Sequence, residues 1–177
     1  MALEPRLLSR GSQSYAGVRD RLLRGELVDA APRLLSEVFA FLRGHQIPTS
    51  GAPLIRYLVV DYNTGEVEID VGVPVHIAAL PADHRVRLRQ IPAGLFATVV
   101  HSGSYSTLME TTAKLLDWAK KNNVRWQVRD DHNVTQWGGR IEHYLVGPPT
   151  ESNANNWRTE IAILLSADSQ PYHRGPL

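Results

Sequence analysis

The sequence predicts a single α+β domain made of two similar halves, each with antiparallel strands and one long helix. Three observations predict it. The 177 residues are about the length of one domain. Two amphipathic helix patterns occur 77 positions apart, with strand patterns around each. Along the chain the order is strand, helix, hairpin, then hairpin, helix, strand, strand, which gives approximate halves at residues 1–80 and 84–166.

The first predicted helix covers residues 32–44. Its apolar residues lie on one helical face and are Leu34, Leu35, Val38, Phe39 and Leu42. Proline suits the first turn of a helix and glycine suits its end, so we expect Pro32 and Gly44 to bound this helix.

A β-hairpin is predicted at residues 54–75. Two strand-like runs flank Asn63, Thr64 and Gly65, which tolerate the positive φ of a tight turn. In the second run acidic and apolar residues alternate, so one face should be wet while the other packs on the helix.

The second half is predicted to begin with another hairpin, after a linker at residues 78–83. Arg85, Arg87 and Arg89 alternate with apolar residues, and strand character resumes at residues 96–101. The turn between these runs is formed by Pro92, Ala93 and Gly94. We expect the arginines to form the solvated face of a half-buried strand rather than a phosphate site.

A second helix is predicted at residues 107–122, followed by an extended segment at 126–128 and strands at 140–146 and 158–165. An offset of 77 aligns the two helices, and an offset of 92 aligns residues 68–73 with 160–165. These offsets indicate a duplication with an insertion in the second half. The domain is expected to end at residue 166, with a flexible tail at 167–177.

Composition and charge exclude several classes of function. Nineteen Lys and Arg against eighteen Asp and Glu leave a formal charge of +1, which gives no global attraction for nucleic acid or an anionic membrane. Cysteine is absent, and neither a secretion signal nor an apolar run of roughly 20 residues occurs. We therefore expect a cytoplasmic protein without direct nucleic-acid or membrane contacts.

Motifs for metal or cofactor chemistry are also missing. No nucleophile elbow, P-loop or dinucleotide fingerprint occurs. Asp130, Asp131 and His132 are adjacent in one loop, and three consecutive residues do not converge on a metal at tetrahedral angles. We therefore expect neither a metal nor a cofactor.

Several stretches resemble a known family. They are VEIDVGVPV at 67–75, IPAGLFATVVHSGSYSTL at 91–108, LLDWAKKNNV at the end of the second helix, EHYL at 142–145 and TEIAILL at 159–165. In order and spacing they resemble the GyrI-like effector-binding family, which also forms the C-terminal drug-sensing domain of multidrug-responsive transcription regulators. Because the sequence begins almost directly at the sensor, we expect a stand-alone member without a helix-turn-helix domain.

The resemblance implies two pseudo-symmetric halves that enclose a central ligand cleft lined by aromatic side chains and one glutamate. In the family pattern this glutamate lies two residues before a tyrosine in the penultimate strand, which here gives Glu142 and Tyr144. Strand side chains alternate, so both should line the cleft while His143 points away. The alternative is a solvated Glu142 that pairs with an arginine.

Rigid rings bury a large area with little loss of entropy, so aromatic residues are expected to form the cleft walls. The predicted ligand-binding residues are Glu142, Tyr144, Trp137, Tyr105, Tyr57, Phe96, Trp118 and Trp157. Trp118 shares one helix side with Leu115, so ordinary core packing is an alternative for it.

The predicted function is binding of small, hydrophobic, cationic organic molecules, in multidrug or xenobiotic sensing or sequestration. The alternative is a hydrolase of strained electrophiles, such as cyclopropane-bearing DNA-alkylating compounds, with Glu142 and Tyr144 as catalytic residues. A third hypothesis is a pure protein-interaction role, such as inhibition of a DNA-processing enzyme.

Overall fold

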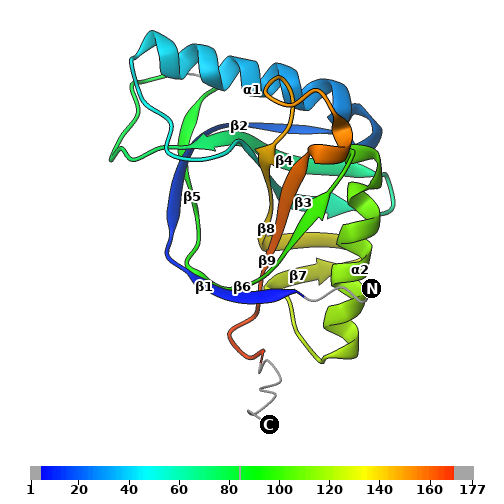
Figure 1. The fold of residues 1–177 in the computed structure, drawn as a ribbon. Coiled ribbons are helices and arrows are strands. Elements are labelled where there is room, and N and C mark those ends of the chain that lie inside the picture. Colours follow the sequence, from blue (N-terminus) through cyan, green and yellow to red (C-terminus); the bar gives the residue numbers. More distant parts are fainter. Residues whose placement is uncertain (1–4, 84, 170–177) are drawn as a thin grey trace.

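The computed structural model describes residues 5–83 and 85–169, whose arrangement is shown in Figure 1. The strands are β1 Arg6–Arg10, β2 Gln13–Leu23, β3 Leu54–Asp61, β4 Glu66–Pro74, β5 Arg87–Ile91, β6 Gly94–Ser102, β7 Val128–Asp131, β8 Val134–Val146 and β9 Arg158–Leu164. The helices are α1 Leu27–Gly44 and α2 Leu108–Lys121, with short 3-10 helices η1 Arg24–Glu26, η2 Tyr105–Thr107 and η3 Ala154–Asn156. Of the tail predicted at 167–177, residues 170–177 lie outside the described part.

All described strands belong to one antiparallel sheet in the order β1-β6-β9-β8-β3-β4-β2-β5, and β7 pairs with β8. A unit of strand, helix and two strands occurs twice, as β2-α1-β3-β4 and as β6-α2-β8-β9. Ile69 pairs with Tyr57 in the first unit, and Ile161, 92 positions later, pairs with Glu142 in the second. The predicted α+β fold with two similar halves is therefore confirmed, and Tyr57 and Glu142 occupy equivalent places in it.

The hairpin predicted at 54–75 is confirmed as β3 and β4, whereas the second predicted hairpin is wrong. β5 pairs with β2, and β6 pairs with β1 and β9. The N-terminal segment replaces the local partner, because residues 6–10 pair with 94–98 and residues 13–17 pair with 87–91. This long-range pairing satisfies backbone groups along both segments, which a two-stranded hairpin by itself would leave at open edges.

Both predicted helices are present, but α1 begins at Leu27 and contains Pro32 in its interior. The earlier start follows from Glu26. Its carboxylate accepts a hydrogen bond from the Leu23 N–H at 2.8 Å and so caps the N-terminus of η1, which leads directly into α1. Neither helix of the described residues has the length and apolar character needed to cross a membrane.

The two sides of the curled sheet carry separate cores. Both helices pack on one side, which we term the helix side, and its buried residues include Leu34, Val38, Ile69, Leu115 and Ile161. The opposite side curls inward and is termed the enclosed side. Its core consists of Tyr15, Leu54, Ile91, Phe96, Ile141, Ala162 and Leu164.

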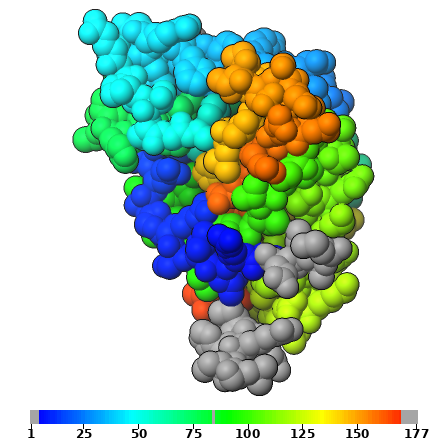
Figure 2. Space-filling model, in the orientation of Figure 1, coloured from blue at the N-terminus to red at the C-terminus, as the bar shows by residue number. Residues whose placement is uncertain are grey.

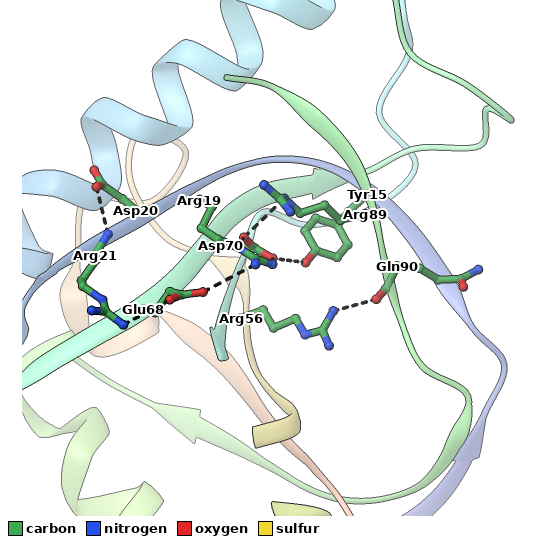
Figure 3. Close-up of polar contacts among 9 residues, drawn as sticks. All are labelled: Tyr15, Arg19, Asp20, Arg21, Arg56, Glu68, Asp70, Arg89 and Gln90. Carbon is green, nitrogen blue, oxygen red and sulfur yellow. Dashed lines mark hydrogen bonds and ion pairs between the residues drawn. The ribbon is translucent and has the colours of Figure 1, made fainter. Parts of the chain in front are cut away.

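A polar network braces the enclosed side (Figure 3). Asp70 of β4 is fully buried. Its carboxylate accepts hydrogen bonds from the Tyr15 hydroxyl at 2.6 Å and from Arg19 Nε at 2.9 Å, and Arg89 Nε lies 3.3 Å away. Since these partners come from β2 and β5, the network ties three strands together.

The prediction that Arg85, Arg87 and Arg89 form a solvated face is therefore only partly correct. Arg85 and Arg87 are exposed, whereas Arg89 turns inward to Asp70. A fully buried carboxylate requires a partner, which explains the inward turn. Arg56 of β3 also crosses the enclosed side and donates to the backbone carbonyls of Gln90 and Gly138 at 2.6 and 3.0 Å.

Gly72 offers a test of this packing, because a Cβ there would lie 2.5 Å from the Ala16 carbonyl oxygen and 2.8 Å from the Tyr15 ring. We expect Gly72→Ala to lower the free energy of unfolding by about 1–3 kcal/mol, the usual cost of overpacking. Chemical denaturation measures this change. Gly44→Ala is the control, since no atom lies within 4 Å of its added Cβ; a Gly72→Ala protein as stable as this control would contradict the packing.

Candidate functional site

Glu142 lies on the helix side of β8, near the middle of the sheet. Its side chain is 5% exposed. The Oε2 atom accepts hydrogen bonds from the hydroxyls of Tyr144 at 2.8 Å and Tyr57 at 3.3 Å. Within the described part of the chain, no hydrogen bond reaches Oε1 and no cation lies within ion-pair distance. This geometry differs from the alternative of a solvated glutamate paired with an arginine.

The strand register explains this position. In the β3–β8 pair, Arg56 is opposite Ile141, and the next residues, Tyr57 and Glu142, both face the helix side. The two halves of the fold meet at this strand pair. The equivalent residues of the two halves therefore lie beside each other, and the site is at the junction of the halves.

The Glu142 carboxylate is only partly compensated. Burial raises the pKa of Glu142, and the charge of Arg140 and the hydrogen bonds from Tyr144 and Tyr57 offset part of the rise. Burial and the adjacent carboxylate also raise the pKa of both tyrosines, so their hydroxyls stay protonated and act as donors. The two tyrosine hydroxyls are neutral, and Arg140 does not touch the carboxylate. Together they stabilise the negative charge less than an arginine in direct contact would.

Arg140 is the functional neighbour that the sequence reasoning missed. Its guanidinium carbon lies 4.6 Å from the centre of the Tyr57 ring and 5.1 Å from that of the Trp137 ring. The guanidinium is thus stacked on two rings rather than paired with Glu142. The available signal was its position two residues before Glu142, on the same face of the strand.

Tyr105 and Trp157 form what we term the aromatic cover, beside Tyr144. The Tyr105 ring meets Tyr144 edge-on, with centroids 5.3 Å apart, and lies tilted against Trp157 at 4.5 Å. Both residues of the cover are half-buried and come from different loops, at η2 and directly after η3. The Tyr105 hydroxyl lies against Gly147, where a Cβ would collide with it.

His101, also missed, anchors the loop that carries Tyr105. It is 6% exposed, with Nε2 at 3.0 Å from the Ser104 carbonyl and Nδ1 at 2.8 Å from the Thr111 hydroxyl. A carbonyl only accepts, so His101 Nε2 donates to Ser104, while the Thr111 hydroxyl can either donate to Nδ1 or accept from it. The sequence contains no local signal for this contact, because Thr111 belongs to the next helix.

The predicted ligand-binding residues are gathered only in part. Those that lie together are Glu142, Tyr144, Tyr57, Tyr105 and Trp157. Trp137 joins them through Arg140. Phe96 lies in the core of the enclosed side, where β6 pairs with β1 and β9. Trp118 packs from α2 against the helix-side core.

The structure shows a cavity of about 850 Å³ on the enclosed side, and none of the predicted residues lines it. Glu142 is instead covered by its own aromatic neighbours. The described residues also contain no group of three or more His, Asp or Glu that could hold a metal ion.

The family model of the GyrI-like small molecule binding domain matches residues 61–166 of the sequence. No curated protein matches the sequence significantly. Among solved structures, EcmrR in complex with DNA has a TM-score of 0.77 at 15% identity, covering 93% of this chain and 58% of EcmrR. The C-terminal domain of EcmrR alone has a TM-score of 0.76 at 16% identity, with 94% and 99% covered.

Two further similar structures come from other proteins. SAV2435 bound to tetraphenylphosphonium has a TM-score of 0.64 at 12% identity, with 93% of this chain and 95% of that one covered. A hydrolase from Listeria innocua has a TM-score of 0.57 at 12% identity, with 93% of each chain covered. At these identities the likeness concerns the fold, and this chain spans 58% of the EcmrR chain in its DNA complex.

The raised pKa of Glu142 predicts how its replacement changes stability. A carboxyl group with a raised folded-state pKa stabilises the fold while it is neutral. For Glu142 this contribution to the free energy of unfolding is lost as the pH rises from the unfolded-state pKa, about 4.3, through the higher folded-state pKa. We therefore expect Glu142→Gln to raise the midpoint of thermal unfolding at pH 7, by about 2–4 °C if the charge costs about 1 kcal/mol. The difference from the wild type should shrink towards pH 4. Calorimetry at several pH values measures both effects.

Glu160→Gln is the matched control with the opposite sign. Burial favours a higher pKa for Glu160, but hydrogen bonds and charges from His143 and Arg10 outweigh it and lower the pKa to about 2. The stabilisation from Glu160 is present above the unfolded-state pKa and is lost as the pH falls towards 2. We expect Glu160→Gln to lower the midpoint at pH 7. A lower midpoint for Glu142→Gln as well would show that the Glu142 charge is fully compensated.

Proposed function

The chain belongs to the family of GyrI-like small molecule binding domains, and from this premise we propose that it binds small, apolar organic cations at Glu142. The observation that carries the proposal is a buried carboxylate with two neutral donors on Oε2 and, among the residues that the structure describes, no cation in contact. A cationic ligand at Oε1 supplies the missing charge.

The surroundings of Glu142 favour a delocalised organic cation over a small, strongly hydrated ion. A charge pair is stronger in a poorly solvated site, but a compact ion loses much hydration on entering it. The ring faces of Tyr105, Tyr144 and Trp157 add cation–π attraction of about 0.5–2 kcal/mol each. A cation with an apolar, aromatic body gains from both effects.

In this proposal the ligand reaches Glu142 by displacing the aromatic cover. Tyr105 and Trp157 are half-buried and belong to separate loops at one end of the site. Moving their side chains requires no strand pairing to break, in contrast to Tyr57, which lies on a central strand of the sheet. The ligand therefore selects an open conformation of the cover and stabilises it.

The biological role that fits this chemistry is sensing or sequestration of drugs and other xenobiotics in the cytoplasm. SAV2435, which shares the fold, binds tetraphenylphosphonium, a lipophilic cation. Stacking surfaces accept many flat molecules, so we expect broad selectivity set by shape and one charge.

Hydrolysis of a strained electrophile is the second candidate, because a hydrolase from Listeria innocua has a similar fold. Glu142 would take a proton from water, whose oxygen bonds to a cyclopropane carbon. The electrons of the broken C–C bond would move to a conjugated carbonyl oxygen, which a tyrosine protonates. The hydroxyls of Tyr57 and Tyr144 are both directed at Glu142, and neither is free to protonate a ligand, so the geometry favours binding.

Tetraphenylphosphonium is the probe for the cation site. We expect it to raise the thermal unfolding midpoint and to bind with a measurable Kd in calorimetry, whereas neutral triphenylphosphine oxide binds at least tenfold more weakly. Glu142→Gln should weaken binding of tetraphenylphosphonium at least tenfold without changing binding of triphenylphosphine oxide. Glu37→Gln, a replacement on α1 in the pair with Arg85, is the control. Equal phosphonium affinity in Glu142→Gln and the wild type would exclude the proposal.

Mass spectrometry separates binding from hydrolysis. We expect a cyclopropane-bearing conjugated ketone to be recovered unchanged after incubation with the protein, at the rate seen in buffer. Accelerated addition of water that disappears in Glu142→Gln would instead establish the hydrolase.

A further inference from the structure

The cavity of about 850 Å³ opens at one end of the enclosed side. It is bordered by the segment between β1 and β2, the loop before β3, residues 74–78 after β4, and the end of β8. In Figure 2 the N-terminal segment (blue), the chain near residue 51 (cyan) and the end of β8 (yellow) meet on this face of the molecule. Its volume is within the range of small-molecule sites, about 300–1,000 Å³.

The cavity is separate from the cation site. Glu142 and His143 are consecutive on β8, so their side chains point to opposite sides of the sheet. Glu142 faces the helix side, while His143, 9% exposed, lines the cavity. The sheet itself lies between the two sites, and a ligand in the cavity does not touch Glu142.

Arg10, His143 and Glu160 form the polar floor of the cavity. Arg10 Nη1 and Nη2 donate to the two carboxylate oxygens of Glu160 at 2.9 and 2.8 Å. His143 Nδ1 lies 3.4 Å from Glu160 Oε1. A guanidinium has five N–H donors, of which this pair uses two, and in the described residues no hydrogen bond reaches His143 Nε2.

Arg10 therefore keeps N–H donors that its pair with Glu160 does not use. The pKa of Glu160 is lowered to about 2, because the bonds and charges of His143 and Arg10 outweigh its burial. Glu160 stays ionised and holds both partners in place, so its negative charge is already matched. The unused N–H groups of Arg10 are suited to an anionic oxygen.

The remaining walls are largely apolar. They are formed by Ala52, Pro74, Val75, Ile77, Ala78 and Leu145. Leu145 is 49% exposed, and covering such an apolar side chain removes it from water, which is favourable. A ligand with an apolar body beside its charged group would gain from these walls.

We infer that this cavity is a second binding site, for a small organic acid whose carboxylate accepts hydrogen bonds from the unused N–H groups of Arg10 and whose apolar body covers Leu145. The site prefers a charge opposite to that bound at Glu142. It does not depend on the cation site, because the two ligands contact different sides of the sheet.

Calorimetry with naphthalene-2-carboxylate and its neutral amide tests the inference on the full chain. We expect the carboxylate to bind at least tenfold more tightly than the amide. The double variant Arg10→Met/Glu160→Gln removes both members of the floor pair, so neither is left as an unpaired charge, and it should weaken the carboxylate at least tenfold. The matched control is Arg85→Met/Glu37→Gln, which removes an exposed arginine–glutamate pair with an Nε–Oε1 distance of 2.6 Å and should leave the affinity unchanged.

Two measurements on the wild-type protein do not depend on variant folding. In ¹H–¹⁵N spectra the carboxylate should shift the amides of residues 11–14 and 75–78, and saturating tetraphenylphosphonium should not displace it. Equal affinity for acid and amide, unchanged binding in the floor variant, or displacement by the phosphonium would each overturn the second site. Glu142→Gln should bind the acid normally, so a failure of the cation site does not affect this result.

Discussion

A carboxylate that leaves water needs compensation, and the two carboxylates buried in this sheet differ in how they obtain it. Asp70 has a tyrosine hydroxyl and two arginines within 3.3 Å, and these partners come from β2 and β5. Glu142 has two tyrosine hydroxyls, while Arg140 is stacked on aromatic rings instead of touching it. The partners of Asp70 thus satisfy it without a ligand, whereas Glu142, within the described residues, has an oxygen without a hydrogen bond and a charge that is only partly compensated.

The duplicated topology explains why this charge lies where it does. The two units meet at β3 and β8, which brings Tyr57 and Glu142 together at the centre of the sheet. At the edges, the N-terminal segment pairs with the segment that leads into the second unit. This pairing of distant segments curls the sheet and creates an enclosed side with its own core and cavity. One sheet can therefore present different chemistry on its two sides.

Features set within one strand or helix could be predicted from the sequence, whereas those set by distant pairing could not. Glu142 and Tyr144 share a face because alternation is a local property of a strand. The second hairpin was predicted wrongly, because the turn chemistry near Pro92 is overridden by pairing with the N-terminal segment. The placement of Phe96 in the other core depended on the same pairing.

The contacts around Glu142 were partly beyond sequence reasoning for a related reason. Stacking of Arg140 on Tyr57 and Trp137 requires side chains from different strands to meet. The contact between Tyr105 and Trp157 joins two loops that are far apart in sequence. Family resemblance indicated a cleft, but the sequence has no local signal for the contact that these two side chains make beside Tyr144.

A crystal structure of the protein with tetraphenylphosphonium tests the central claim most directly. The account predicts the phosphonium within about 6 Å of the surrounding rings and next to Oε1 of Glu142, with the Tyr105 ring moved away from Tyr144. A phosphonium bound elsewhere, with the aromatic cover still closed over Glu142, would contradict it.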